Sequence, residues 1–286
     1  MPSLLIVGYT SYVSGKTILA GSLVSVLRSR GLDAVGVKPL AGVDAWEYPW
    51  ILRVIRDRRV VVSGDALRLY TASEGVEGLE TISPVTVIMA PRDPSKQMWR
   101  LPDPEKREPV LGRISVCRAN RVDTVHFINT DALNRASNGI VAAILEAAGR
   151  LQPLPLRAGD DFAERVLSGA FTREAESCIA KVLASHDYVL FESNSDIAVP
   201  TPSALGAEWV LVVAPGSVGL VKGERWAKAV ELLAGPGGLR AITVREVLSL
   251  TGVLETFQLP FLSDPMEGYK EQDLDALISY ITEPRG

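Results

Sequence analysis

Residues 3–17 read SLLIVGYTSYVSGKT. The run Ser3–Gly8 is almost wholly apolar and ends in glycine, which is typical of a strand buried on both faces of a parallel sheet. Lys16–Arg30 then carries apolar residues at helical spacing, and Gly31 provides a helix stop. A second short apolar run, Asp33–Lys38, follows. This order of strand, loop, helix and strand predicts two parallel strands joined by a right-handed crossover.

The same alternation returns in the second half of the chain. Three apolar runs there are expected to be inner strands: Tyr188–Glu192, Trp209–Ala214 and Leu239–Val244. The segments with helical periodicity are Phe162–Ser185, with one or two helices, Gly219–Leu233 and Asp273–Ile281. Strands that alternate with helices predict an α/β fold with a doubly wound, mostly parallel sheet.

The middle of the chain is less regular. Arg92–Glu108 is rich in proline and charge and is interpreted as a surface loop. Val110–Cys117 and Val122–Ile128 flank a polar turn and are expected to form a hairpin, and Asn129–Ala148 is expected to be helical. We therefore predict a single domain, residues 1–286, with residues 92–150 as an inserted subregion.

Composition excludes several classes of protein. The net charge of the 286 residues is −4, which disfavours a general electrostatic affinity for nucleic acid. No apolar run is long enough to span a bilayer, so no membrane partner is expected. Cys117 and Cys178 lie far apart in the sequence, which argues against a disulfide scaffold and a zinc site and suits a reducing compartment. These features predict a cytoplasmic protein. Asn and Gln total only 9, which suits a heat-adapted protein or simply reflects codon bias.

The strongest motif lies between the first strand and the first helix. Its residues are Thr10, Ser11, Tyr12, Val13, Ser14, Gly15, Lys16 and Thr17. They match the phosphate-binding pattern G-x-x-x-x-G-K-[ST] except at the first position. Successive backbone N–H groups in such a loop form a concavity for anions, and Lys16 would reach the β- and γ-phosphates. The hydroxyl of Thr17 would bind Mg²⁺. The expected fold is therefore of the P-loop NTPase type, with ATP or GTP and Mg²⁺ as cofactors.

On these residues the chain resembles the dethiobiotin synthetase family of P-loop proteins. That family also has threonine at the first loop position and a Lys-Pro pair at the end of its second strand, which Lys38-Pro39 matches in spacing. The resemblance implies that Lys16 and Lys38 are catalytic and that Asp65 and Glu192 join Thr17 in binding magnesium. It further implies that Pro260, Phe261 and Leu262 lie beside the nucleotide base. A homodimer is implied as well, and a reaction in which a small carboxylate or carbamate is phosphorylated.

Other positions depart from the family's pattern. Ser193-Asn194-Ser195-Asp196 follows Glu192 where the family has Gly-Ala-Gly-Gly, and Arg245 lies where the family reads adenine with asparagine. These differences predict that phosphate handling is retained while the substrate differs from that of dethiobiotin synthetase. Three functions therefore stay open: a synthetase acting on a small molecule, a switch ATPase or GTPase, and a regulatory nucleotide-binding module.

Some candidate residues have simpler interpretations. Asp65 has the alternative role of a helix cap, and Lys38 that of a solvated charge. His126 and His186 are interpreted as structural. An aromatic group, Trp46, Tyr48 and Trp50, is interpreted as packing or as the wall of a substrate pocket. The basic run that follows is interpreted as a solvated helix end; its residues are Arg53, Arg56, Arg58 and Arg59.

Overall fold

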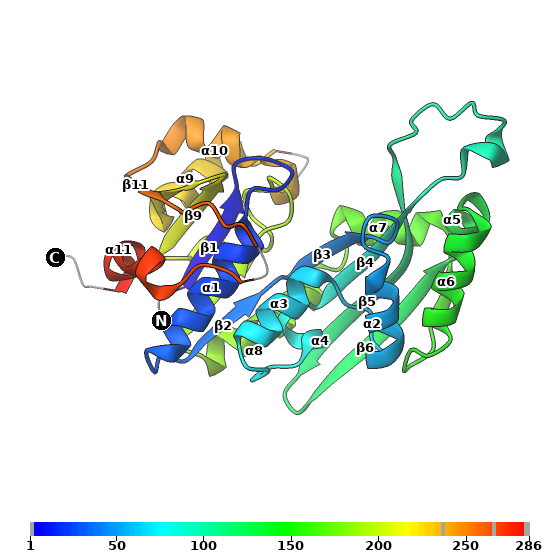
Figure 1. Ribbon diagram of the computed structural model, residues 1–286, viewed down its shortest axis with the longest axis horizontal. Helices are drawn as coiled ribbons and strands as arrows, with labels where there is room; N and C mark the ends of the chain where they lie inside the picture. Colours follow the sequence, from blue (N-terminus) through cyan, green and yellow to red (C-terminus); the bar gives the residue numbers. More distant parts are fainter. Residues whose placement is uncertain (1–2, 236–237, 265–266, 283–286) are drawn as a thin grey trace. The chain divides into compact units, whose positions relative to one another are not determined.

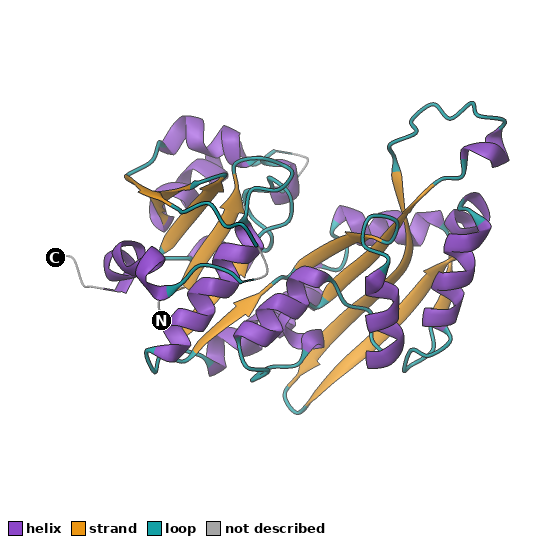
Figure 2. Cartoon of the chain, viewed as in Figure 1, coloured by secondary structure: helices purple, strands orange, loops and turns teal. Residues whose placement is uncertain are grey.

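The computed structural model describes residues 3–235, 238–264 and 267–282 and confirms an α/β fold with parallel strand pairs (Figures 1 and 2). The chain forms two compact units, each with its own sheet. Unit 1 comprises Met1–Pro39, Arg68–Gly78 and Ile179–Gly286, and unit 2 comprises Leu40–Leu67 and Leu79–Cys178. The sequence predicted one sheet with an insertion at 92–150, and that whole segment falls inside unit 2.

The sheet of unit 1 has six strands in the order β11-β10-β9-β1-β8-β2. Strands β2, β8, β1 and β9 run parallel, whereas β10 and β11 are antiparallel additions at one edge. Their bounds are β1 Ser3–Gly8, β2 Ala34–Val37, β8 Tyr188–Glu192, β9 Trp209–Ala214, β10 Ser217–Lys222 and β11 Glu255–Gln258. The predicted strands at Ser3–Gly8, Tyr188–Glu192 and Trp209–Ala214 are confirmed, because continuous apolar runs mark strands buried on both faces.

Helices pack on this sheet, with α1 against β1, β2 and β8 and α9 against β9 and β10. The helices that lie wholly in unit 1 are α1 Lys16–Ser29, α9 Gly223–Leu233, α10 Val244–Thr251 and α11 Glu271–Thr282, with short 3₁₀ turns η2 Pro202–Gly206 and η3 Leu239–Ala241. Two helices cross between the chain segments of the two units: α3 Gly64–Ala72 and α8 Thr172–Ser185. The predicted helices at the start of the chain and at its C-terminal end are confirmed.

Two predicted elements of unit 1 are wrong. The expected strand Leu239–Val244 is instead a 3₁₀ turn followed by the start of α10. Thr243 and Glu246 form a capping box, in which each side chain bonds to the other residue's backbone, and this T-x-x-E signal was present in the sequence. The expected helix Gly219–Leu233 begins only at Gly223, because Ser217–Lys222 pairs with β9 after the tight turn at Gly216.

The sheet of unit 2 has five strands in the order β3-β4-β5-β6-β7. Pairs β3–β4 and β6–β7 are parallel, and β4–β5–β6 is antiparallel, which confirms the predicted hairpin. The strands are β3 Leu40–Asp44, β4 Val85–Pro91, β5 Arg107–Arg118, β6 Arg121–Asn129 and β7 Leu156–Ala158. The helices are α2 Trp50–Arg58, α4 Leu79–Ile82, α5 Thr130–Arg135, α6 Asn138–Ala148 and α7 Asp160–Ser168, with the 3₁₀ turn η1 Pro94–Gln97.

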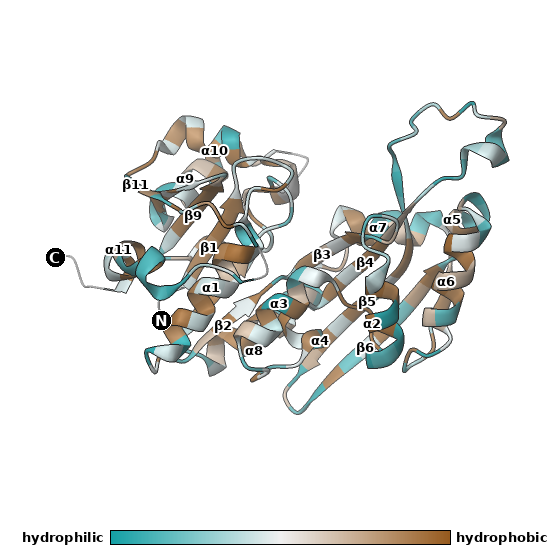
Figure 3. Cartoon of the chain, in the orientation of Figure 1, coloured by the Kyte–Doolittle hydropathy of each residue, from teal (hydrophilic) through white to brown (hydrophobic). Residues whose placement is uncertain are grey.

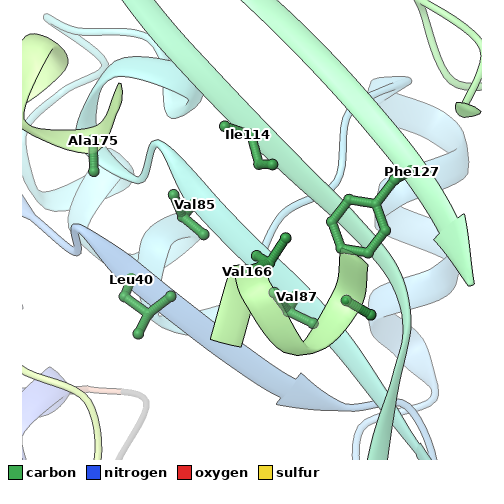
Figure 4. Packing of buried hydrophobic residues seen from close by; sticks show 8 residues of the cluster. Leu40, Val85, Val87, Ile114, Phe127, Val166 and Ala175 are labelled. Carbon is green, nitrogen blue, oxygen red and sulfur yellow. The ribbon is translucent and has the colours of Figure 1, made fainter. Parts of the chain in front are cut away.

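Unit 2 has a hydrophobic core of its own (Figure 4). Strand residues such as Val87 and Phe127 meet Val166 of α7 and Ala175 of α8, and the ring of Phe127 packs edge-on against Phe162 at 5.2 Å between centroids. The hydropathy colouring shows hydrophobic residues, in brown, along β1 of unit 1 and along β5 of unit 2 (Figure 3). This independent core explains why residues 40–67 and 79–178 form a compact unit.

A disulfide bond joins Cys117 of β5 to Cys178 of α8, although the sequence argued against a disulfide scaffold. The cysteines are 61 positions apart in the sequence, which hid this proximity, because a strand and a distant helix meet only through tertiary packing. The backbone N–H of Cys117 also donates to the hydroxyl of Ser177, 3.0 Å away, which fixes the same contact. The disulfide therefore covalently secures α8 to the sheet of unit 2.

We expect the double variant Cys117→Ala/Cys178→Ala to unfold more easily than the wild type. Closing a loop of this length lowers the entropy of the unfolded chain, which corresponds to about 4 kcal/mol at most. The measurement is thermal and urea unfolding, and wild type with a reductant serves as the control that removes only the cross-link. Equal unfolding midpoints for wild type with and without reductant would contradict the expected stabilisation.

Candidate functional site

The predicted phosphate-binding loop connects β1 to α1 in unit 1 and has an unusual backbone. Val13 has φ 47° and Gly15, at the start of α1, has φ 91°, both in the left-handed region. That conformation is normal for glycine but strained for a β-branched residue such as valine. The side chains of Tyr12 and Val13 are 79% and 89% exposed, so no packing of these side chains explains the strain. Strained backbone that is retained in this way is commonly found at binding sites.

The loop leaves a row of backbone donors open. None of the N–H groups from Ser11 to Gly15 donates a hydrogen bond to any residue that the structure describes. The one internal bond of the loop's first half runs from the hydroxyl of Thr10 to the carbonyl of Tyr12, at 2.8 Å. Open N–H groups that lead into a helix N-terminus provide donors and positive potential for an anion.

Lys16 is held over this loop by two acceptors. Its Nζ donates to Ser14 Oγ at 3.1 Å and to the carbonyl oxygen of Ser195 at 2.8 Å. The residue is only 9% exposed, and it reaches back along the loop because Gly8, at the end of β1, has no side chain. These two bonds pre-position the ammonium group beside the loop.

A second group of side chains lies at the end of β8. Glu192 accepts a hydrogen bond from the hydroxyl of Thr17 at 2.6 Å and an ion-pair bond from Lys38 Nζ at 2.8 Å, both at Oε1. Lys38 also donates to the carbonyl of Ser193 at 3.2 Å. The side chains of Lys38 and Glu192 are 2% and 1% exposed, so Lys38 is not the solvated charge of the alternative interpretation. Burying two charges is costly unless they are paired, and here they are.

Sheet topology brings these residues together. Strand β8 lies between β1 and β2, all three parallel, so their carboxyl ends meet at one edge of the sheet. Glu192 ends the central strand, the loop with Lys16 and Thr17 follows β1, and Lys38 follows β2. Ligands of open α/β sheets bind at such an edge. The structure thus gathers four of the residues that the sequence singled out.

The other predicted residues lie in the first turn of α3 and between β11 and α11. Asp65 lies in the first turn of α3 and belongs to unit 2, and Ser63 rather than Asp65 caps the Ala66 amide, at 3.1 Å. Its role as a magnesium ligand stays a prediction. Pro260, Phe261 and Leu262 lie in unit 1 between β11 and α11, where Phe261 is 95% exposed. A role beside the nucleotide base stays a prediction for them as well.

Two residues near the group were missed from the sequence. Ser195 supplies the carbonyl that holds Lys16, and its φ of 50° lies in the left-handed region. Arg68, on α3, lies close enough to Glu192 for the two charges to attract, although burial lowers the pKa of this arginine overall. Gly21 of α1 leaves room for Arg68, since a Cβ there would lie 3.3 Å from its side chain. Arg68 could not be identified from the sequence, because it is one arginine among many. Ser195 could have been identified, because it departs from the glycine of the family's pattern.

We expect Gly8→Ala to disturb the position of Lys16 without unfolding the protein. A Cβ at Gly8 would lie 2.5 Å from Lys16 Nζ, 2.7 Å from Ser14 Oγ and 3.0 Å from the carbonyl of Ser195, so the lysine must move. Anion affinity at the loop should fall about tenfold, the loss of about one charge-assisted hydrogen bond. Titration with MgATP measures it.

The matched control for this variant is Gly42→Ala, which also places a methyl group on a strand glycine. A Cβ at Gly42 meets nothing within 4 Å. The interpretation of Gly8 is wrong if both variants bind MgATP with the affinity of the wild type.

The comparisons with known proteins leave the chain without an assigned family. No protein-family model matches the sequence, and a search of curated proteins finds no significant match.

None of the helices in the described ranges is long and apolar enough to cross a membrane. Within residues 3–235, 238–264 and 267–282, no three His, Cys, Asp or Glu side chains are grouped so as to hold a metal ion.

Proposed function

We propose that this protein binds a nucleoside triphosphate with Mg²⁺ at the β1–α1 loop and transfers its γ-phosphoryl group. The observation that carries the proposal is the convergence of Lys16, Thr17, Lys38 and Glu192 at the carboxyl ends of β1, β8 and β2, next to a loop with open N–H groups. Two lysines there would offset the charge of a triphosphate and of the group being transferred. This reading makes unit 1 a domain of the P-loop NTPase type.

The residues at the end of β8 suit a magnesium ion. Mg²⁺ prefers hard oxygen ligands and usually keeps several waters, so it needs few protein side chains. The Thr17 hydroxyl and the Glu192 carboxylate lie 2.6 Å apart and supply such oxygens. When bound, the ion would neutralise phosphate charge during transfer. Lys38 would hold the carboxylate in place.

Within this class we favour a synthetase that resembles dethiobiotin synthetase and phosphorylates a small carboxylate or carbamate, using ATP or GTP. The buried Lys38 supports it, because a second lysine beside the loop suits charge build-up on both the nucleotide and the acceptor. Ser195 also supports it: its backbone is in a conformation that favours glycine, at a position where that family carries glycine. A homodimer is part of the same proposal.

One observation favours the alternative, a switch or regulatory nucleotide-binding module. Tyr12 and Val13 present apolar side chains to solvent on the loop itself. An exposed apolar loop tip that contacts nucleotide would let a partner sense whether the site is filled. Phosphate release distinguishes the two functions, because a synthetase releases phosphate only when its acceptor substrate is present.

The cytoplasm, where nucleoside triphosphates are abundant, is the location we propose. The Cys117–Cys178 disulfide then needs an explanation, because most cytoplasmic proteins keep their thiols reduced. Intracellular proteins of hyperthermophiles are the known exception, and the scarcity of Asn and Gln suits such a source.

The deciding experiment is calorimetric titration of the full chain with ATP and with GTP, each with Mg²⁺ and with EDTA. Binding that requires Mg²⁺ and prefers one base supports the proposal and identifies the nucleotide. Phosphate release in the presence of a panel of small carboxylates and amines then separates a synthetase from a switch, for which dimerisation that depends on the triphosphate is expected. Absence of binding to both nucleotides would overturn the proposal.

A further inference from the structure

A pocket of about 480 Å³ opens in unit 2 between α2 and α6. It lies apart in sequence from every residue proposed to bind nucleotide, and all of its lining residues belong to unit 2. The two helices pack against each other, and Figure 1 shows both beside the same sheet. Its volume falls within the range of sites that bind small molecules.

Small residues on α6 create this space. Gly139, Ala143 and Ala147 recur at four-residue spacing on the helix face that lines the pocket. A Cβ added at Gly139 would meet nothing within 4 Å, so the space beside this residue is empty. Larger residues at these positions would fill the gap between the helices.

The remaining walls are mostly apolar and include an exposed aromatic ring. Leu52 of α2 and Ile140 of α6 contribute aliphatic surface. Trp46 lines the pocket while 64% exposed, and its backbone N–H donates to Asp44 Oδ1 at 2.7 Å, which fixes the turn that carries it. A flat indole held at the edge of an apolar pocket offers a surface for another flat apolar group.

Positive charges outnumber negative charges in the lining of the pocket. Arg56 of α2 is already paired, with Glu146 of α6 and with Asp57, each at 3.0 Å. Arg53, one turn earlier on the same face, lines the pocket but forms no hydrogen bond or ion pair with any residue that the structure describes. Arg53, Arg56 and Glu146 are the charged residues of the lining, so the lining itself has a net charge of +1.

We propose that this pocket binds a small organic anion, namely a flat apolar molecule that carries one carboxylate. Its apolar body would lie against Leu52, Ile140 and Trp46, and its carboxylate would bind the guanidinium of Arg53, whose fork geometry matches a carboxylate. One residue of the aromatic group, Trp46, and two of the basic run, Arg53 and Arg56, thus line the same site. The inference does not rest on the proposed nucleotide site, which lies in unit 1.

The test uses 2-naphthoate as the probe and 2-naphthamide as its neutral counterpart, both titrated into the full chain by calorimetry. Three variants accompany the wild type: Arg53→Gln removes the charge, Gly139→Leu fills the pocket, and Arg165→Gln removes an exposed charge of unit 2 that does not line it. Circular dichroism and thermal unfolding check that each variant is folded.

We expect naphthoate to bind and naphthamide to bind at least tenfold more weakly. Arg53→Gln should weaken naphthoate binding about tenfold, the loss of one charged hydrogen-bonding partner, while Arg165→Gln leaves it unchanged. Gly139→Leu should abolish binding of both probes in a folded protein. The proposal is overturned if naphthoate does not bind the wild type, if the amide binds equally well, or if folded Gly139→Leu still binds.

Discussion

Replacing Lys16 by alanine is expected to weaken the binding of MgATP or MgGTP about 100-fold and to stop phosphoryl transfer. The Nζ of this lysine lies at the loop mouth, where Ser14 and the carbonyl of Ser195 hold it. No other described residue of the loop carries a positive charge, so within the loop only the open N–H groups would then face the phosphates. A hydrogen bond between charged partners contributes about 3 kcal/mol at most, which corresponds to the expected loss in affinity.

Calorimetry measures that affinity, and a phosphate-release assay measures turnover. Lys228→Ala is the matched control, because it removes the same charge from an exposed position on α9. Wild-type nucleotide affinity in a folded Lys16→Ala variant would remove the basis for assigning the loop to phosphate. An equal loss of nucleotide affinity in Lys228→Ala would show that the effect comes from the net charge of the protein and not from the position of Lys16.

The second large effect is expected at Glu192. Glu192→Gln keeps the shape of the side chain but leaves the ammonium of Lys38 buried without its carboxylate. Breaking a buried ion pair from one side costs about 3–5 kcal/mol of stability, far more than an exposed pair. The same change removes the oxygen ligand proposed for Mg²⁺, so turnover should fall as well. Urea unfolding measures the first loss and phosphate release the second.

A double variant separates the two roles of this pair. Glu192→Gln/Lys38→Met removes both charges, and it should recover much of the stability because no buried ammonium is left uncompensated. Activity should stay lost, since both proposed functional groups are absent. If the double variant regained activity together with stability, the pair would be structural and the proposed site would lose two of its four members.

The features that the sequence predicted correctly have local causes. Ser3–Gly8, Tyr188–Glu192 and Trp209–Ala214 were recognisable because strands buried on both faces need uninterrupted apolar residues. The helix after the loop followed from its apolar periodicity and from Gly31. The errors at residues 217–222 and 239–244 arose where short apolar segments fit more than one element and where pairing with β9 or a capping box decided the outcome.

The sequence by itself determined the α/β class and the loop with Lys16 and Thr17. It also identified Lys38 and Glu192 as candidate site residues. Only the tertiary structure decided that a second sheet with its own core forms, because strand pairing between distant segments is not encoded in local periodicity. It also decided the partner of Glu192, since Lys38 lies 154 residues away along the chain and meets it only where parallel strands end. The Cys117–Cys178 bond and the pocket beside Arg53 likewise exist only once helices pack on the sheet of unit 2.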